Sequence, residues 1–275
     1  MEEVFGKGTS CCGCSACAAI CGSGAISMYR NAKGFLEPFI LDVECVDCGQ
    51  CRAICPVLNR HIQSNPDFKT FLYKADREHR EHSQSGAAFG VIAEQFILSG
   101  GIVYGAVLDD LYCKYTSAHT LEELMAIKKS KYVQADVGDV FSEIGEALQS
   151  GKRILFGGTP CHVDGLRSYI KNKCINDSHL YLIDIVCHGT PSPMLFENYL
   201  EYFSKTHRDC RIKDFNFRDK RFGWYGHVTI STGKRQIVSD AYNKLFYSHY
   251  AHRDSCFACK YANLDRPGDL TVGDA

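Results

Sequence analysis

The sequence lacks a charge excess, a long apolar run and an apolar leader. Its 31 basic and 32 acidic residues leave a net charge of -1, so it has no basic footprint for nucleic acid. No apolar run approaches the ~18 residues that a membrane span requires. The N-terminal residues 1–4 are acidic and lack the apolar segment of a signal peptide. These absences predict a cytoplasmic protein with no membrane span and no nucleic-acid partner.

Cysteine, by contrast, is abundant, with 16 copies among 275 residues. Without an export signal, disulfides are disfavoured, because cytosolic thiols are kept reduced. The cysteines therefore indicate metal or redox chemistry in a reducing compartment. The composition is otherwise that of a globular chain, with 45% hydrophobic residues and enough length for one or two domains.

Eight of the cysteines form two runs with the spacing C-x2-C-x2-C-x3-C, and Pro56 follows the second run. This is the spacing of bacterial two-cluster ferredoxins, in which three thiolates of a run bind one [4Fe–4S] cluster and the fourth crosses to the other cluster. Gly22 replaces the proline after the first run, and Cys12 lies out of register and is interpreted as a spare thiol. The predicted ligands of cluster I are Cys11, Cys14, Cys17 and Cys55, and those of cluster II are Cys45, Cys48, Cys51 and Cys21.

Zinc is the main competing interpretation of these cysteines. Eight thiolates arranged as C-x2-C pairs could build two zinc sites with four ligands each. Zinc does not need two consecutive runs that each end in a three-residue spacer, however. The doubled spacing therefore favours two [4Fe–4S] clusters over zinc.

Residues 1–62 are predicted to form an α+β, ferredoxin-like domain of the two-cluster type. Between the cysteine runs, residues 26–29 and 35–38 have the pattern of a small hairpin. The domain has little apolar core of its own, so we expect the clusters to hold it together. Residues 61–68 are polar, contain Pro66 and are predicted to be a linker.

Residues 68–275 are predicted to form an α/β domain with a mostly parallel sheet, because strand and helix patterns alternate. The predicted strands are 70–75, 102–108, 112–119, 153–156 and 180–186. The predicted helices are 87–98, 121–128, capped by Thr120, 137–149, 162–170 and one that begins at Pro193, capped by Ser192. Three antiparallel strands at 211–218, 225–231 and 235–239 and a helix at 242–250 are expected to follow.

Two turns of this domain carry candidate functional residues. Ligands of open α/β sheets bind outside the carboxyl ends of the strands, and Cys161 and Cys187 lie at two such ends. The turn at 157–161 is either a cradle for an anionic cofactor or an ordinary tight turn. Together with the C-x-x-C pair Cys256 and Cys259, the two cysteines could bind a third [4Fe–4S] cluster, although buried cysteine is also common in cores. His162 and His188 are interpreted as hydrogen-bonding partners.

Short segments spread along the chain form a further pattern. Beside the two cysteine runs, they are Ser85-Gly86, Ser130-Lys131-Tyr132-Val133-Gln134, Phe156-Gly157-Gly158-Thr159-Pro160-Cys161, Cys187-His188-Gly189-Thr190-Pro191-Ser192-Pro193, Phe217-Arg218-Asp219-Lys220 with Gly223-Trp224, Arg253-Asp254-Ser255-Cys256-Phe257-Ala258-Cys259 and Gly268-Asp269-Leu270-Thr271-Val272-Gly273-Asp274. In this order they resemble the bacterial branch of the family of coenzyme F-420 hydrogenase/dehydrogenase beta subunits.

The resemblance implies a flavoprotein in which [4Fe–4S] clusters exchange electrons with FAD. It implies that the flavin is lined by Ser85, Gly86, Lys131, Gly158, Thr159 and Pro160. The family's pattern continues beyond Asp274, so the C-terminal end of the 68–275 domain is expected to be truncated.

Two hypotheses about function follow. The first is an oxidoreductase that passes electrons between [4Fe–4S] clusters and FAD, to or from a two-electron acceptor such as coenzyme F-420 or another small molecule. The second is a non-catalytic electron-relay subunit of a larger redox complex, without a flavin of its own. Either would need a redox partner protein, such as a ferredoxin or a dehydrogenase or hydrogenase subunit. The sequence does not identify the donor, the acceptor or the direction of electron flow.

Overall fold

A five-stranded sheet forms the centre of the computed structural model, which describes residues 10–59, 68–208, 210–223 and 227–274. The strand order is β10-β6-β5-β3-β4. Strands β3 (Ile102–Asp109), β5 (Ile154–Gly158), β6 (Leu180–Ile185) and β10 (Leu270–Val272) are parallel, and β4 (Tyr112–Ala118) pairs antiparallel with β3 at one edge. The predicted mostly parallel sheet is confirmed.

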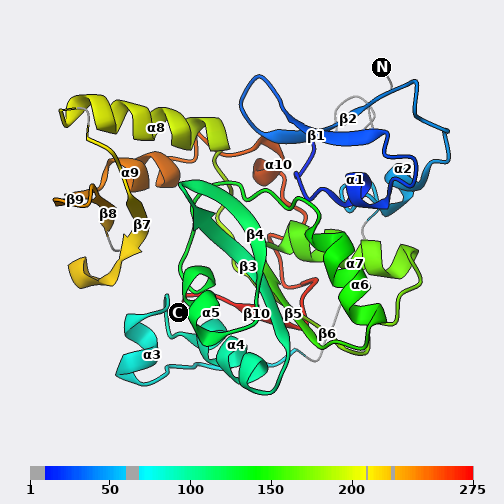
Figure 1. Ribbon diagram of the computed structural model, residues 1–275, viewed down its shortest axis with the longest axis horizontal. Helices are drawn as coiled ribbons and strands as arrows, with labels where there is room; N and C mark the ends of the chain where they lie inside the picture. Colours follow the sequence, from blue (N-terminus) through cyan, green and yellow to red (C-terminus); the bar gives the residue numbers. More distant parts are fainter. Residues whose placement is uncertain (1–9, 60–67, 209, 224–226, 275) are drawn as a thin grey trace.

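Helices cover both faces of this sheet (Figure 1). Helices α4 (Ala88–Leu98) and α5 (Leu121–Ile127) lie on one face, and α6 (Val140–Gln149) and α7 (Pro160–Asn172) lie on the other. Successive side chains of a strand point to opposite faces. Accordingly, Leu155 of β5 is buried with the α4 and α5 residues, whereas Phe156 is buried with the α6 and α7 residues.

The helix starts follow the sequence signals closely. Thr120 accepts a hydrogen bond from the Glu123 backbone N–H, and the Glu123 carboxylate accepts one from the Thr120 N–H, which completes a capping box on α5. Ser192 caps α8 (Pro193–Thr206) by accepting from the Leu195 N–H, with Pro193 in the first turn. Both predicted caps are confirmed.

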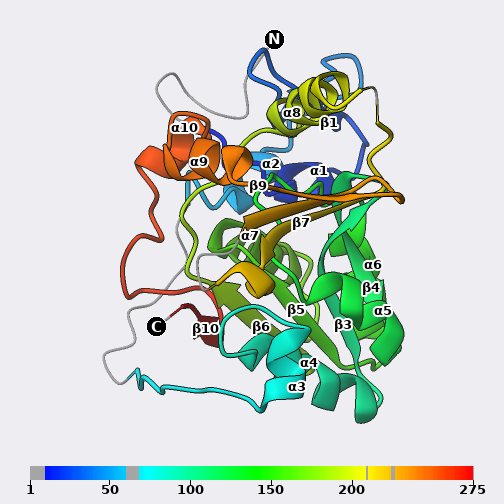
Figure 2. The same ribbon diagram turned by 90° about the vertical axis from the view of Figure 1, so that its left-hand side faces the viewer.

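A second sheet stands apart from the first and is antiparallel, as predicted. It contains β7 (Asp214–Asp219), β8 (His227–Ser231) and β9 (Gln236–Ser239), with a 3-10 helix at Lys220–Phe222 after β7. Helices α8 and α9 (Ala241–Tyr247) pack beside it (Figure 2). Its core is aromatic, with edge-to-face contacts among Phe196, Phe215 and Tyr242. Residues 224–226, which include Trp224 and the start of the predicted strand at 225–231, lie outside the described residues.

The N-terminal region, residues 10–59, contains helix α1 (Ala16–Ile20), strands β1 (Ile26–Arg30) and β2 (Leu36–Ile40), and helix α2 (Gln50–Ile54). The two strands form the predicted antiparallel hairpin. Ala16, Ile20 and Ile54 are buried in the same core as Phe141 of α6 and Leu166 of α7. The region is therefore seated on α6 and α7, as Figure 1 shows.

One predicted element is wrong. Residues 70–75 form no strand, and the side chains of Phe71 and Leu72 are 78% and 88% exposed. Their strand-like pattern has no sheet face to bury it. The following residues form helix α3 (Arg77–Glu81), which the sequence pattern did not predict. Most of the predicted linker, residues 60–67, lies outside the described residues.

In the described part of the chain, no helix combines the length and the apolar character that crossing a membrane requires.

Candidate iron–sulfur and flavin sites

The four predicted ligands of cluster I line one cavity. Its lining residues are Cys11, Cys12, Cys14, Ser15, Cys17, Met28, Cys55, Pro56 and Val57. Three of these ligands come from the first run and one from the second. This is the arrangement that the crossover of the fourth cysteine requires. The donor set, four thiols around one cavity, fits a [4Fe–4S] cluster.

The predicted ligands of cluster II lie at the surface. Cys45 and Cys48 are exposed, whereas Cys21 and Cys51 are half-buried. The thiols of Cys21, Cys45 and Cys48 lie close enough to Cys51 to raise its pKa further, after burial, which is the main cause of the upward shift. This set again takes three cysteines from one run and one from the other. Cluster II is thus expected at the surface and cluster I inside.

Burial makes the cluster I thiols hard to ionise while no iron is bound. It raises the pKa of Cys11 to about 11, although the nearby Arg253 charge opposes this shift. Burial, followed by repulsion from Cys11 and Cys55, raises the pKa of Cys17 as well. Iron binds the thiolate form. Cluster assembly must therefore release protons from this cavity, which couples iron binding to pH.

Within the described ranges, no group of three or more His, Cys, Asp or Glu side chains is arranged to hold a single metal ion. A [4Fe–4S] cluster has four iron atoms, and each is bound by its own thiolate. Its ligands therefore surround a larger volume than the ligands of one zinc ion do.

The four cysteines considered for a third cluster also lie near one another. Cys187 is within electrostatic range of Cys161, Cys256 and Cys259, and Cys256 is within range of Cys161. Cys161 lies in the first turn of α7, because this helix begins at Pro160, two residues before the predicted start. Cys256 is in helix α10 (Asp254–Phe257). We call these four residues the third cysteine group.

Cys12, interpreted from its register as a spare thiol, lies close to two groups of cysteines. It lines the cluster I cavity, and it lies close enough to Cys14 and Cys161 for their thiols to shift its pKa. Cys12 therefore lies near one predicted ligand of cluster I and one member of the third cysteine group. Spacing along the chain could not reveal this, because Cys161 is far from Cys12 in sequence.

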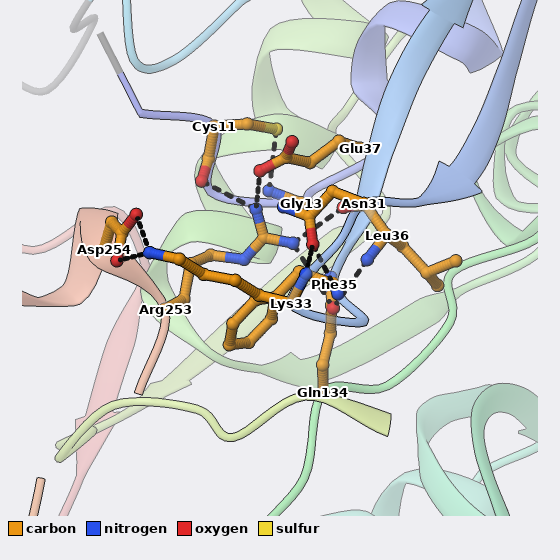
Figure 3. Close-up of polar contacts among 10 residues, drawn as sticks. All are labelled: Cys11, Gly13, Asn31, Lys33, Phe35, Leu36, Glu37, Gln134, Arg253 and Asp254. Carbon is orange, nitrogen blue, oxygen red and sulfur yellow. Dashed lines mark hydrogen bonds and ion pairs between the residues drawn. The ribbon is translucent and has the colours of Figure 1, made fainter. Parts of the chain in front are cut away.

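Arg253 fastens the N-terminal region to the rest of the molecule (Figure 3). Its buried guanidinium donates to the carbonyl oxygens of Cys11 at 2.8 Å and Leu36 at 2.7 Å, and forms an ion pair with Glu37 at 3.2 Å. It also lies over the ring of Phe35, 4.7 Å from its centroid. No signal in the sequence gives Arg253 a role, although it belongs to the segment that ends in the C-x-x-C pair.

Gln134 lies at the same contact and was also missed. Its side-chain oxygen accepts hydrogen bonds from the Leu36 backbone N–H at 3.1 Å and from Arg253 at 3.3 Å. A Cβ atom on Gly13 would lie 2.2 Å from the Gln134 side-chain nitrogen. Only glycine leaves enough room for the loop of the first cysteine run to approach this closely. Beside this contact, Lys33 forms an exposed ion pair with Asp254 (Figure 3).

Two of the predicted flavin positions lie just before helix α4. Ser85 has a positive φ of 50°, and its carbonyl oxygen accepts from Lys220 at 2.9 Å. A Cβ atom on Gly86 would lie 2.3 Å from the carbonyl oxygen of Tyr73. In the same contact, the Ala75 backbone N–H donates a hydrogen bond to the Gly86 carbonyl oxygen at 2.9 Å. The structure therefore gives Ser85 and Gly86 a role in shaping the turn that begins α4.

Lys131 lies beyond α5 and bonds to its carboxyl end. Its ammonium group donates to the carbonyl oxygens of Ala126 at 2.5 Å and Ile127 at 3.1 Å. Burial lowers its pKa to about 7. Because its hydrogen bonds cap a helix, Lys131 has a structural partner, and the flavin contact stays a prediction.

Gly158, Thr159 and Pro160 form the junction between β5 and α7. A Cβ atom on Gly158 would lie 2.7 Å from the hydroxyl of Tyr115, and the Thr159 hydroxyl is 3.3 Å from the Cys161 thiol. At the preceding position, Gly157, a Cβ atom would lie 2.4 Å from the ring of Phe89, which is in the first turn of α4. The N-terminal ends of α4 and α7 therefore both lie at the carboxyl end of β5, where their free N–H groups favour an anion.

His162 links this junction to the first cysteine run. The ring is buried and is 2.9 Å from the Tyr115 hydroxyl through Nδ1. Burial lowers its pKa to about 4, and a hydrogen bond to the Gly13 backbone partly offsets the shift. The interpretation of His162 as a hydrogen-bonding partner is confirmed. His188 is exposed.

Comparisons with known proteins cover both parts of the chain. Residues 151–275 match the family described as the C terminus of the coenzyme F420 hydrogenase/dehydrogenase beta subunit, and residues 10–59 match the family described as "4Fe-4S dicluster domain". The F subunit of the F(420)H(2) dehydrogenase of Methanosarcina mazei is 24% identical over 191 residues, which are 64% of this chain and 53% of that protein. The chain thus spans about half the length of this curated relative.

Among solved structures, one similar chain belongs to the F420-reducing [NiFe] hydrogenase complex of Methanosarcina barkeri. It is 15% identical, with a TM-score of 0.49, over 74% of this chain and 68% of that chain.

Proposed function

Because the chain belongs to the family of coenzyme F-420 hydrogenase/dehydrogenase beta subunits, we propose that it is an iron–sulfur flavoprotein that passes electrons between [4Fe–4S] clusters and FAD. Its N-terminal region matches a two-cluster iron–sulfur domain. The proposal adds to this the flavin, the third cluster and a catalytic role.

One observation carries the iron–sulfur part of the proposal. The cluster I cavity is lined by three cysteines of the first run and by Cys55 of the second. A cysteine that binds no cluster need not lie beside the cysteines of the other run. The fourth ligand of a run in a two-cluster ferredoxin must do so, because it binds the cluster of the other run. We assign Cys11, Cys14, Cys17 and Cys55 to cluster I on this basis.

The cysteine groups lie in an order that suits electron transfer. Cys51 of cluster II lies within electrostatic range of Cys17 of cluster I. Cys12, which lines the cluster I cavity, lies within electrostatic range of Cys161 of the third cysteine group, and Cys161 contacts Thr159 of the predicted flavin turn. We propose that electrons follow this order between the exposed cluster II and the carboxyl end of the central sheet. The ligands alone do not set the direction of electron flow, because the reduction potentials of [4Fe–4S] clusters span about 1 V.

The flavin is proposed to bind at the carboxyl end of β5. When bound, FAD would exchange electrons singly with the clusters and in pairs with an acceptor. The N-terminal ends of α4 and α7 would hold its pyrophosphate, since helix N-termini favour anions. Ser85, Gly86, Gly158, Thr159 and Pro160 would allow the backbone to approach it. Lys131, which is close to α5, would add a positive charge.

The alternative is a relay subunit without its own flavin. The curated relative is named as a subunit of F(420)H(2) dehydrogenase, which favours a partner subunit in either case. The acceptor is proposed to be coenzyme F-420 or another two-electron small molecule, and the partner a ferredoxin or a dehydrogenase or hydrogenase subunit.

Anaerobic purification with iron, acid-labile sulfide and flavin measured per chain separates these proposals. Two clusters and a flavin predict about eight iron atoms, about eight sulfides and one FAD, and a third cluster predicts about twelve iron atoms. Iron without flavin would favour the relay subunit. Little or no iron after anaerobic reconstitution would overturn the iron–sulfur assignment.

A further inference from the structure

Helix α3 has no apolar anchor in the fold. None of its five residues, Arg77–Glu81, is buried, and the segment before it is exposed at Phe71 and Leu72. A helix of this length is not stable by itself in water. The position of α3 must therefore depend on polar contacts with the elements around it.

His79 makes one of these contacts through each of its ring nitrogens. Nδ1 lies 2.7 Å from a carboxylate oxygen of Asp76, the N-cap residue of α3. Nε2 lies 3.0 Å from a carboxylate oxygen of Glu94 in α4. Glu94 also pairs with the buried Lys128, which ends α5, so its carboxylate is held in place from the other side. His79 therefore connects α3 to a fixed point on α4.

The chemistry of these contacts determines the protonation state of His79. An ionised carboxylate accepts hydrogen bonds and cannot donate them, so both ring nitrogens must donate. Neutral imidazole has one N–H group, whereas imidazolium has two. The arrangement is therefore that of imidazolium. In agreement with this, the hydrogen bond to Asp76 and the negative charges of Asp76 and Glu94 raise the pKa of His79.

We propose that His79 is a pH-sensitive latch that holds α3 on α4 while its ring is protonated and releases α3 when the ring loses a proton. In the neutral ring one nitrogen becomes an acceptor and faces a carboxylate oxygen, with no hydrogen atom to join them. The charged groups around the ring are Asp76 and Arg80 on its own segment, Glu94 on α4 and, behind Glu94, Lys128 at the end of α5. Of these residue types histidine is the one that ordinarily titrates between pH 5 and pH 8.

The direction of the pH effect follows from the raised pKa of His79. The stabilisation from such a histidine is fully present below its ordinary pKa of about 6.5 and is lost as the pH rises through the raised value. The latch is therefore closed at pH 6 and opens toward pH 8.5. Its opening is a local event at α3 and leaves the central sheet folded.

Lys220 connects α3 to the turn that begins α4. Its ammonium group donates to the carbonyl oxygen of Arg80 in α3 at 2.8 Å and to that of Ser85 at 2.9 Å. Release of α3 would therefore loosen the turn in which Ser85 and Gly86 are predicted to line a flavin. The latch itself needs neither a flavin nor a cluster, so its failure and the failure of the proposed function can be told apart.

The test measures hydrogen exchange of the α3 amides at pH 6 and pH 8.5 in the anaerobically reconstituted protein. Each rate is expressed as protection relative to the intrinsic exchange rate at the same pH. His79→Gln keeps one N–H donor and does not titrate, whereas His79→Arg keeps a positive charge and several N–H donors at both pH values. His82→Gln is the matched control, because His82 is exposed and follows the last residue of α3.

The unaltered protein is expected to lose about fivefold of its α3 protection between pH 6 and pH 8.5, the effect of one ion pair at the upper end of the usual range. His79→Gln should show the lower protection at both pH values, and His79→Arg the higher protection at both. His82→Gln should show the same fall as the unaltered protein, and the amides of β5 should show none.

Three results would overturn the inference. Equal α3 protection at the two pH values in the unaltered protein would show that protonation of His79 does not hold this helix. A fall of the same size in His79→Gln would assign the pH dependence to another group. Low protection of α3 at both pH values in His79→Arg would show that a positive charge at this position does not close the latch.

Discussion

The N-terminal region and the sheet region of this protein are stabilised in different ways. The sheet region buries large side chains on both faces, including Phe141 and Leu166 on one face and Leu124 and Leu155 on the other. Residues 10–59 have two five-residue helices and a hairpin of two five-residue strands, and the buried members of their separate small core are Cys17 and Ile26. Ala16, Ile20 and Ile54 of this region are instead buried in the core of α6 and α7. The N-terminal region thus depends on its clusters and on its contact with α7.

This comparison predicts that loss of cluster I has the largest effect. Cys55→Ser should remove about four iron atoms and increase hydrogen exchange throughout residues 10–59, because binding energy of the metal centre is also folding energy here. The amides of β5 and β6 should stay protected. Iron analysis and hydrogen exchange on the reconstituted protein measure both effects.

The same variant tests the crossover between the two runs. Although Cys55 belongs to the second run, its loss should remove the signal of cluster I and spare that of cluster II. The exposed Cys174→Ser variant should keep all its iron. Loss of cluster II in Cys55→Ser would mean that each run binds its own cluster, which contradicts the cavity-based assignment.

The next largest effect is expected at Arg253, which joins the two regions. Arg253→Met removes buried hydrogen bonds to Cys11 and Leu36 and leaves Glu37 without this partner. We expect the β1–β2 hairpin to be destabilised by about 3 kcal/mol, because removing one member of a buried charged contact leaves its partners buried and unpaired. Hydrogen exchange of the hairpin amides, relative to β5 amides, measures this.

Arg235→Met is the matched control for Arg253→Met. Arg235 lies in the exposed turn between β8 and β9, so its loss should leave hairpin exchange unchanged. If Arg253→Met also left it unchanged, the contact seen in Figure 3 would not hold the two regions together.

A smaller effect, confined to the sheet region, is expected from Gly86→Ala. The added Cβ would lie 2.3 Å from the carbonyl oxygen of Tyr73. Moving this backbone atom costs more free energy than moving the end of a flexible side chain would. We expect a loss of about 2 kcal/mol, as for other overpacked sites, and reduced FAD per chain with unchanged iron. Gly22→Ala is the control, because a Cβ there meets no atom within 4 Å. A Gly86→Ala protein with normal thermal stability would contradict the tight packing.

Local signals in the sequence predicted the elements of both regions well. The cysteine spacing, the Thr120 and Ser192 caps and the strand–helix alternation each depend on residues a few positions apart. The pattern at 70–75 failed because a strand also needs a neighbouring strand and a face to bury, and neither can be seen in a short segment.

The contacts between the regions could not be predicted in this way. Arg253 bonds to Cys11, 242 residues away in the chain, and Cys12 lies near Cys161 because the first cysteine run packs on α7. The segment Arg253–Cys259 stood out in the sequence through its resemblance to a family, which marks residues but does not say what they touch. Lys131 illustrates the same limit, since its hydrogen bonds to the end of α5 give it a role that no motif suggested.

Lys131 allows the smallest effect to be tested, through pH alone. Burial lowers its pKa from 10.5 to about 7 in the folded protein, whereas the unfolded chain keeps an ordinary lysine. Between about pH 7 and pH 10 the unfolded chain therefore binds more protons than the folded one, so stability rises with pH in this window. Lys131→Met should remove this rise, and Lys129→Met, at the exposed neighbouring lysine, should keep it. Denaturant unfolding of the sheet region at pH 7, 8 and 9 makes the measurement. The contrary result is a stability of the unaltered protein that falls over this range, with the same slope in Lys131→Met. It would mean that Lys131 stays charged and is available to a flavin phosphate.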